Sequence, residues 1–131
     1  MTSPIRLLAM AGLLALPACS PPPIRIDVGK AADGRMQAHL SQDWGFIIPR
    51  REAPCIREIA LHSVETPYGN PIWQARRAGD DTQCTPLSTI ILGAPPPGFA
   101  QTGPLPKTLR GPYLLTIRGI GFGDRVVSLA P

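Results

Sequence analysis

The stretch Ile24-Arg25-Ile26-Asp27-Val28 leads through Asp33-Gly34 into Met36-Gln37-Ala38-His39-Leu40. In both runs apolar residues alternate with polar ones, which is the period of a strand that buries one face. An Asp-Gly pair between two such runs is a turn signal. This stretch therefore predicts a hairpin or two neighbouring strands, and it favours an all-β fold.

The rest of the chain continues the same pattern. The whole chain has seventeen prolines and thirteen glycines, which are too frequent for a helical bundle. Eight short strands at this spacing predict a single small antiparallel β-sandwich. Besides the first two, the expected strands cover 44–48, 55–64, 72–76, 87–92, 113–118 and 125–129.

A late segment bears on the type of sandwich. Leu109-Arg110-Gly111-Pro112-Tyr113, which runs on into Leu115 and Ile117, resembles the start of a late strand in immunoglobulin-like and transthyretin-like domains. In those domains a turn delivers a tyrosine and then an alternating strand. The resemblance implies a fold type only, because unrelated functions share these folds.

The N-terminal region has the parts of an export signal. Arg6 is followed by the apolar run 7–16, which is shorter than the roughly 20 residues that span a bilayer. The segment Leu16-Pro17-Ala18-Cys19 resembles the lipobox of bacterial lipoproteins, although proline is unusual at its second position. The resemblance implies that residues 1–18 form a helical signal peptide and that Cys19 becomes a lipidated first residue.

The same resemblance implies a location. Two or three acyl chains on Cys19 would anchor the protein to a membrane. Ser20 replaces the Asp that favours retention in the inner membrane, so we expect the outer membrane, on its periplasmic side or flipped to the cell surface. Residues 19–23 form a proline-rich tether that reaches roughly 15 to 18 Å when extended. The folded domain, 24–131, would then lie close to the lipid.

The remaining cysteines suggest a pair. With Cys19 assigned to lipid, Cys55 and Cys84 are left in an oxidising compartment, where we expect a disulfide. A reactive thiol or a metal pair is the alternative. Neither has support, because no Cys-x-x-Cys spacing occurs and the chain has only two histidines. We expect no metal and no cofactor.

Candidate contact residues fall into two groups. The doublets Arg50-Arg51 and Arg76-Arg77 lie at strand edges, and together they would bind an anion if they converge. Trp44 would then sit at the level of lipid headgroups, whereas Trp73 is expected in the core. The alternative is that these arginines are only part of a solvated surface.

The second group lies in the longest expected irregular segment, 93–112. Because its prolines limit the entropy lost on binding, Phe99 and Leu105 are candidate contacts for a partner protein. The alternative is that this loop folds back and covers an open edge of the sandwich.

No catalytic constellation is present. The chain has no Gly-x-Ser-x-Gly, His-Glu-x-x-His or phosphate-binding glycine motif. Gly119, Gly121 and Gly123 are interpreted as a turn between two strands. His39 and His62 are expected on the polar sides of strands, with no catalytic or metal role.

These observations predict a non-catalytic binding or assembly module with an envelope protein as its partner and no affinity for nucleic acid. The alternative is a binder of peptidoglycan, glycan or lipid A that uses arginine and tryptophan. A third hypothesis is a peptidoglycan hydrolase that draws a carboxylate pair from Glu52, Glu58 and Glu65.

Overall fold

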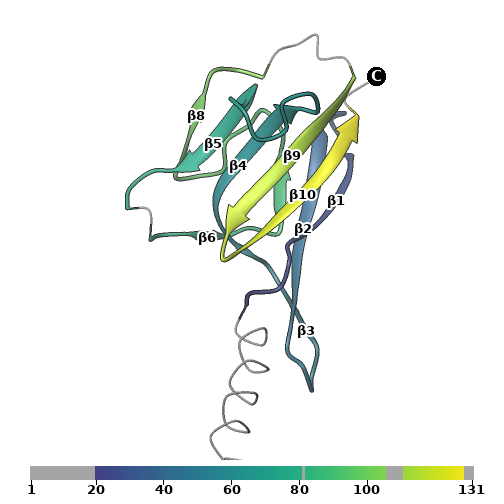
Figure 1. The fold of residues 1–131 in the computed structure, drawn as a ribbon, viewed down its shortest axis with the longest axis vertical. Coiled ribbons are helices and arrows are strands. Elements are labelled where there is room, and N and C mark those ends of the chain that lie inside the picture. The colour runs from purple at the N-terminus through teal and green to yellow at the C-terminus, as the bar shows by residue number, and fades with distance from the viewer. Residues whose placement is uncertain (1–19, 81, 106–110, 129–131) are drawn as a thin grey trace, which may run out of the picture.

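The computed structural model describes residues 20–80, 82–105 and 111–128. These residues form ten strands and no helix, arranged in two antiparallel sheets (Figure 1). The all-β prediction is therefore confirmed. Within the described ranges no helix is long and apolar enough to cross a membrane. The expected signal peptide, 1–18, and the expected lipid-bearing Cys19 lie outside them.

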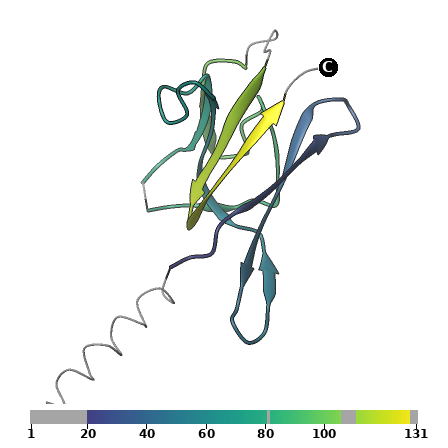
Figure 2. The same cartoon turned by 45° about the vertical axis from the view of Figure 1, so that its right-hand side comes forward.

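The smaller sheet is built on the predicted hairpin. Strands β1 (Arg25–Lys30) and β2 (Met36–Trp44) pair antiparallel. On its other side β2 pairs first with β7 (Thr89–Ile91) and then, at its far end, with β3 (Arg50–Glu52). Figures 1 and 2 show that the β2–β3 hairpin projects beyond the body of the domain.

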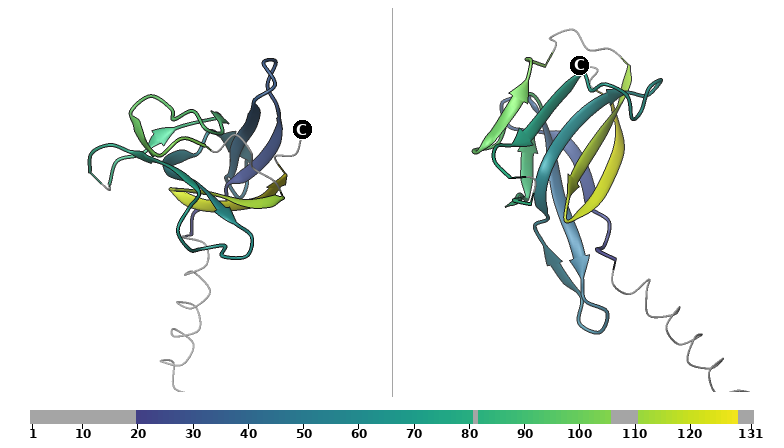
Figure 3. Two further views of the ribbon diagram at one scale, coloured as in Figure 1. Left: turned by 90° about the horizontal axis from the view of Figure 1, so that it is seen from above. Right: turned by 60° about the vertical axis from the view of Figure 1, so that its left-hand side comes forward.

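The larger sheet has the strand order β10-β9-β4-β5-β8. Its central strand β4 (Cys55–Ser63) lies between β9 (Pro112–Gly119) and β5 (Trp73–Arg77). The two edges are β10 (Gly121–Ser128) and β8 (Phe99–Thr102), and the short β6 (Thr85–Pro86) pairs with the start of β4. Figure 3 shows this sheet from two further directions.

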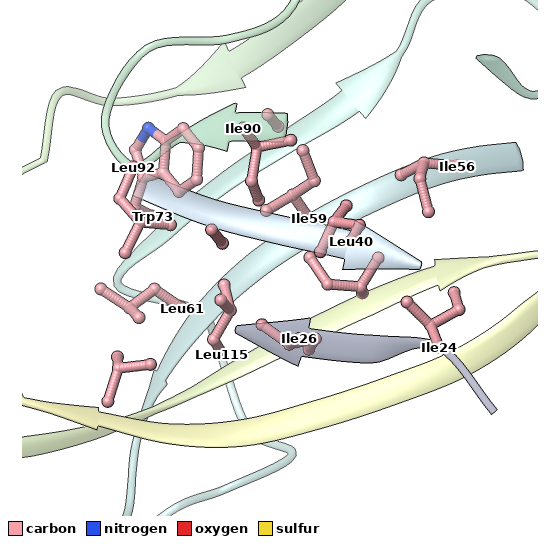
Figure 4. Packing of buried hydrophobic residues seen from close by; sticks show 14 of the residues in the cluster. Ile24, Ile26, Leu40, Ile56, Ile59, Leu61, Trp73, Ile90, Leu92 and Leu115 are labelled. Carbon is pink, nitrogen blue, oxygen red and sulfur yellow. The ribbon is translucent and has the colours of Figure 1, made fainter. Parts of the chain in front are cut away.

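One apolar core is shared by the two sheets. In the larger sheet Leu61 stands in register with Trp73 and Leu115, which places three large side chains on one face. Figure 4 shows them packed against Ile26 and other residues of the smaller sheet. Trp73 is 1% exposed, so its predicted place in the core is confirmed. The core also contains Ile24, Ala38, Leu40, Ile56, Ile59, Ala75, Ile90, Leu92, Phe99, Tyr113, Ile117 and Val127.

The predicted disulfide is present. It joins Cys55, the first residue of β4, to Cys84, immediately before β6, and the two Cα atoms lie 5.2 Å apart. The bond therefore ties the β5–β6 connection to the central strand of the larger sheet.

The strand expected over 44–48 is wrong. Trp44 ends β2 and pairs with Arg50, so the residues between them form the turn of the hairpin. Gly45 has a φ of 92°, a conformation that favours glycine. An added Cβ there would also collide with the carbonyl oxygen of Ile48. The residues 45–49 therefore form a turn, although their apolar side chains favour a strand.

Two further expectations need correction. The strand expected over 87–92 is shorter, because only 89–91 form β7, which joins the smaller sheet, whereas the preceding β6 pairs with β4 in the larger sheet. The segment 93–112, expected to be irregular, contains strand β8, which pairs with the edge strand β5. Only four residues form β8, and prolines lie close by on either side, so its pattern was too short to recognise.

Loss of the disulfide should destabilise the fold. We expect the double variant Cys55→Ser, Cys84→Ser to lose roughly 3 to 4 kcal/mol of unfolding free energy, because the open chain gains entropy when it unfolds. Urea denaturation of the oxidised wild type and the variant measures this. Reduced wild type is the control and should match the variant. A variant as stable as oxidised wild type would contradict the prediction.

Candidate functional site

The two arginine doublets do not meet. Arg50 and Arg51 belong to β3 in the smaller sheet, whereas Arg76 and Arg77 end β5 in the larger sheet. The second doublet lines a pocket of about 380 Å³, which we name the arginine pocket. Its lining residues are Arg57, Glu58, Arg76, Arg77, Asp80, Gln83, Arg118, Gly119, Gly121 and Phe122.

Strand register builds the floor of the arginine pocket. Glu58 on the central strand stands directly opposite Arg76 on β5 and Arg118 on β9. Strict alternation would send Arg57 and Glu58 to opposite faces. A register shift between β4 and β9 falls at this point, between Ile56 and Glu58. Such an irregularity re-aims side chains, which explains how both neighbours line one pocket.

The charges in the arginine pocket are unbalanced. Four guanidinium groups face the two carboxylates of Glu58 and Asp80, a formal excess of two positive charges. Glu58 is already engaged, because one of its oxygens accepts a hydrogen bond from Gln74 at 2.5 Å. Its other oxygen lies 3.9 Å from Nε of Arg76. The pocket is therefore suited to an anionic group.

Two of the guanidinium groups are held in place. Arg77 donates to the hydroxyl of Thr85 and, at 3.4 Å, to the amide oxygen of Gln83. Its Nε is buried and has no hydrogen-bond partner among the described residues. Arg118 lies over the ring of Phe122, 5.4 Å from the ring centroid, at a distance typical of a cation–π contact. Positioned donors lose less entropy when they bind a ligand.

Gln42 joins three segments beside the arginine pocket. Its side chain is 1% exposed, and its Nε2 donates to the carbonyl oxygens of Pro22 at 2.9 Å and Ile120 at 2.6 Å. We call this set of contacts the Gln42 junction. It links the start of the described chain, the base of the β2–β3 hairpin and the β9–β10 turn.

Gly121 makes the Gln42 junction possible. A Cβ at this position would lie 2.8 Å from the carbonyl oxygen of Pro22 and 2.5 Å from the Gln42 side chain. Gly121 also has a φ of 104°. The turn predicted from Gly119 and Gly121 is thus confirmed, whereas Gly123 lies inside β10. There the absence of a side chain lets the backbone of Ile24 approach.

The turn of the β2–β3 hairpin is apolar and exposed. Phe46, Ile47 and Ile48 are 105%, 91% and 74% exposed, and we name these three residues the hairpin tip. Below the tip, Asp43 pairs with Arg25 at 3.0 Å and with Arg51 at 3.2 Å. These hydrogen bonds, that from Arg25 above all, lower the pKa of Asp43.

The other sequence-predicted contacts have different surroundings. Trp44 is half-buried and ends β2 directly before the hairpin tip, where it pairs with Arg50. Phe99 is 8% exposed within the core, and Leu105 packs partly buried against the core. In the described part of the segment 93–112, β8 covers the edge of β5, which favours the alternative in which this loop packs on the sandwich. A contact role for Phe99 would require exposed surface that its ring does not have.

The histidines are separated. His39 is exposed, but His62 is buried, with one ring nitrogen 3.2 Å from the carbonyl oxygen of Gly69 and the other 3.1 Å from the hydroxyl of Thr116. The expectation that His62 lies on a solvated face is wrong, because both faces of β4 are covered near its end. In the described ranges no cluster of His, Cys, Asp or Glu could hold a metal ion.

Sequence reasoning missed Arg57, Arg118 and the hairpin tip. The two arginines become visible as site residues only when the register places them beside Glu58. The tip did carry a signal, since three apolar residues without alternation stand between Gly45 and Pro49. Comparison with known proteins found no matching family model, curated protein or solved structure.

Removing the Gln42 amide should loosen the Gln42 junction. We expect Gln42→Leu to cost about 1 to 3 kcal/mol of unfolding free energy, because two partly buried carbonyl oxygens lose their donor. Gln37→Leu, on the same strand and half-buried, is the control and should cost less. Urea denaturation compares them. Equal losses in the two variants would contradict a special role for Gln42.

The Asp43 pairs should make the hairpin sensitive to acid. A carboxylate whose pKa is lowered by folding adds stability above its unfolded pKa, and this is lost as pH falls through the folded value. Wild type should therefore lose stability below about pH 4 in part through Asp43. Melting temperatures near neutral pH and near pH 3 should differ less for Asp43→Asn than for wild type. An equal fall in both proteins would contradict this.

Proposed function

We propose that this protein is a non-catalytic binding module of the bacterial cell envelope that captures an anionic group in its arginine pocket. In this proposal residues 1–18 are a helical signal peptide, and a lipid on Cys19 anchors the chain at the outer membrane. The ligand is an envelope molecule that carries phosphate or carboxylate, such as lipid A or peptidoglycan. The observation that carries the proposal is the set of four guanidinium groups around one pocket.

The chemistry of arginine supports an anionic ligand. Its planar guanidinium group presents parallel donors that match the oxygens of a phosphate or a carboxylate. Arg77 has a buried Nε with no partner in the described part of the chain, and Arg118 is held by Phe122. A pocket of about 380 Å³ also lies within the range typical of small-ligand sites.

The position of the arginine pocket supports a ligand at the membrane. Gly121 lines the pocket, and the carbonyl oxygen of Pro22 lies directly against it. Residues 19–23 would span only roughly 15 to 18 Å when extended. The pocket would then lie within reach of headgroups and of the layer next to them.

The arginine pocket favours a ligand over the two other hypotheses. Phe99 and Leu105, the residues expected to contact a partner protein, pack in or against the apolar core. Of the carboxylates considered for hydrolysis, Glu58 is engaged by Gln74 and Arg76, and Glu52 lies 3.8 Å from Arg50. We further propose that the two sheets form a sandwich of the immunoglobulin-like or transthyretin-like type, in keeping with their shared core.

Neutralising one pocket arginine should weaken ligand binding. We expect Arg76→Gln or Arg118→Gln to reduce affinity for the preferred ligand by about tenfold, because a charged hydrogen-bond donor is lost. Isothermal titration of the full-length protein in detergent, with lipid A and with soluble muropeptides as separate ligands, measures this. Higher salt should weaken binding by every form of the protein.

Arg35→Gln is the matched control. Arg35 lies at the β1–β2 turn, away from the arginine pocket, and its side chain is 58% exposed, compared with 60% for Arg76. This variant should bind like wild type. If Arg35→Gln and Arg76→Gln weakened ligand binding equally, the loss of affinity would come from the lower net charge and not from the arginine pocket. Absence of binding to both ligands, with capture of a stoichiometric envelope protein instead, would favour the assembly hypothesis.

A further inference from the structure

The hairpin tip is the most exposed apolar surface among the described residues. Phe46, Ile47 and Ile48 follow one another in the chain, and each is more than 70% exposed. Large apolar side chains in such a cluster, on a projecting hairpin, usually mark a surface that contacts something else. They contribute little to the core, which is complete without them.

The hairpin holds its tip in a defined place. Arg25 on β1 and Arg51 on β3 both pair with Asp43 on β2, so ion pairs link all three strands just below the turn. Gly45 adopts a positive φ, and its Cα faces the carbonyl oxygen of Ile48. The apolar residues are thus presented at the end of a braced hairpin.

The composition of the hairpin fits a lipid bilayer. Apolar residues occupy the tip, half-buried Trp44 follows, and Arg50 and Arg51 stand on the next strand. This order matches the membrane interface, where apolar side chains enter the acyl region, tryptophan lies at the headgroups and arginine meets lipid phosphates. A protein groove would not require the flanking tryptophan and arginines.

The hairpin and the first described residues, from Ser20 to Pro22, lie at the same end of the domain. Figures 1 and 2 and the right view of Figure 3 show this placement, and the Gln42 junction connects the base of the hairpin to Pro22. Cys19 directly precedes Ser20, the first described residue. A lipid on Cys19 would hold this end of the domain against the bilayer, so the bilayer is the first apolar phase that the tip meets.

We propose that the β2–β3 hairpin inserts its tip, Phe46-Ile47-Ile48, into the lipid bilayer in which the chain is anchored. The tip then acts as a second attachment beside the lipid on Cys19 and fixes the orientation of the domain. This orientation directs the end that carries the β9–β10 turn toward the headgroups. The inference rests on the membrane anchoring in the proposed function, but not on the ligand of the arginine pocket.

Tryptophan fluorescence tests the insertion directly. The full-length protein, purified with its lipid, is reconstituted into vesicles of phosphatidylethanolamine and phosphatidylglycerol with or without bromine on the acyl chains, which quenches nearby tryptophans. Trp44→Phe provides the background, in which Trp73 stays buried in the core. Phe46→Trp then places a reporter at the tip.

Tyr68→Trp in the same background is the matched control. Tyr68 is 63% exposed and lies in the β4–β5 connection, at the opposite end of the domain from the hairpin (Figure 1). Insertion predicts that brominated lipid removes roughly half of the emission at position 46, because an inserted tip reaches the acyl boundary. The emission at position 68 should be almost unchanged.

Each other outcome overturns the proposal. Equal quenching at both positions would mean that the domain has no fixed orientation, and no quenching at position 46 would mean that the tip stays outside the lipid. A shift of emission at position 46 in native envelopes, without quenching in vesicles, would assign the tip to a protein. Vesicle flotation and the mass of the Cys19 peptide report anchoring separately. If the protein floats with the vesicles but position 46 is not quenched, only the insertion of the tip is contradicted. If the protein does not float, the lipid anchoring is contradicted as well.

Discussion

The close approach of the β9–β10 hairpin to the N-terminal segment is the constraint on which the rest of this structure depends. Gly121 and Gly123 leave no side chain between the two backbones, and the amide of Ile24 donates to the carbonyl oxygen of Phe122 at 3.0 Å. Gln42, buried at the end of β2, donates to the backbone on both sides of this contact. The two sheets are thereby joined at one end by hydrogen bonds as well as by the apolar core.

This contact brings unrelated features of the sequence to one end of the domain. The arginine pocket includes Gly119, Gly121 and Phe122, all from the same hairpin turn and the start of β10. The β2–β3 hairpin leaves the domain just beyond Gln42. The arginine pocket and the hairpin tip are thus both close to the place where the described chain begins. Both surfaces would therefore face the lipid if the proposed anchor on Cys19 is present.

The two surfaces use different physical forces. Attraction between the arginine pocket and an anion is electrostatic and is screened by salt. The proposed insertion of the hairpin tip would depend on the removal of apolar side chains from water, which salt does not screen. A domain that is oriented by its tip would hold its pocket at a constant height above the lipid. The ligand would then meet guanidinium groups that are already positioned.

The sequence alone determined the local features of this protein. Alternation in Ile24 to Val28 and Met36 to Leu40 specified the first hairpin, since a period of two residues commits a strand to one buried face. The assignment of Cys19 to lipid left Cys55 and Cys84 as the predicted disulfide, and the apolar neighbours of Trp73 indicated the core. Each of these conclusions depends on residues that are close in the chain or on the chemistry of a single pair.

Only the tertiary structure decided what lies side by side. Arg57, Arg76 and Arg118 come from three strands, and the register across Glu58 brings them together. Turn geometry at Gly45 converted an expected strand into the hairpin tip, and strand β8 depended on pairing with β5. The physical reason is common to all three. Non-local pairing is chosen by the packing of whole sheets, and a short segment of sequence does not contain that information.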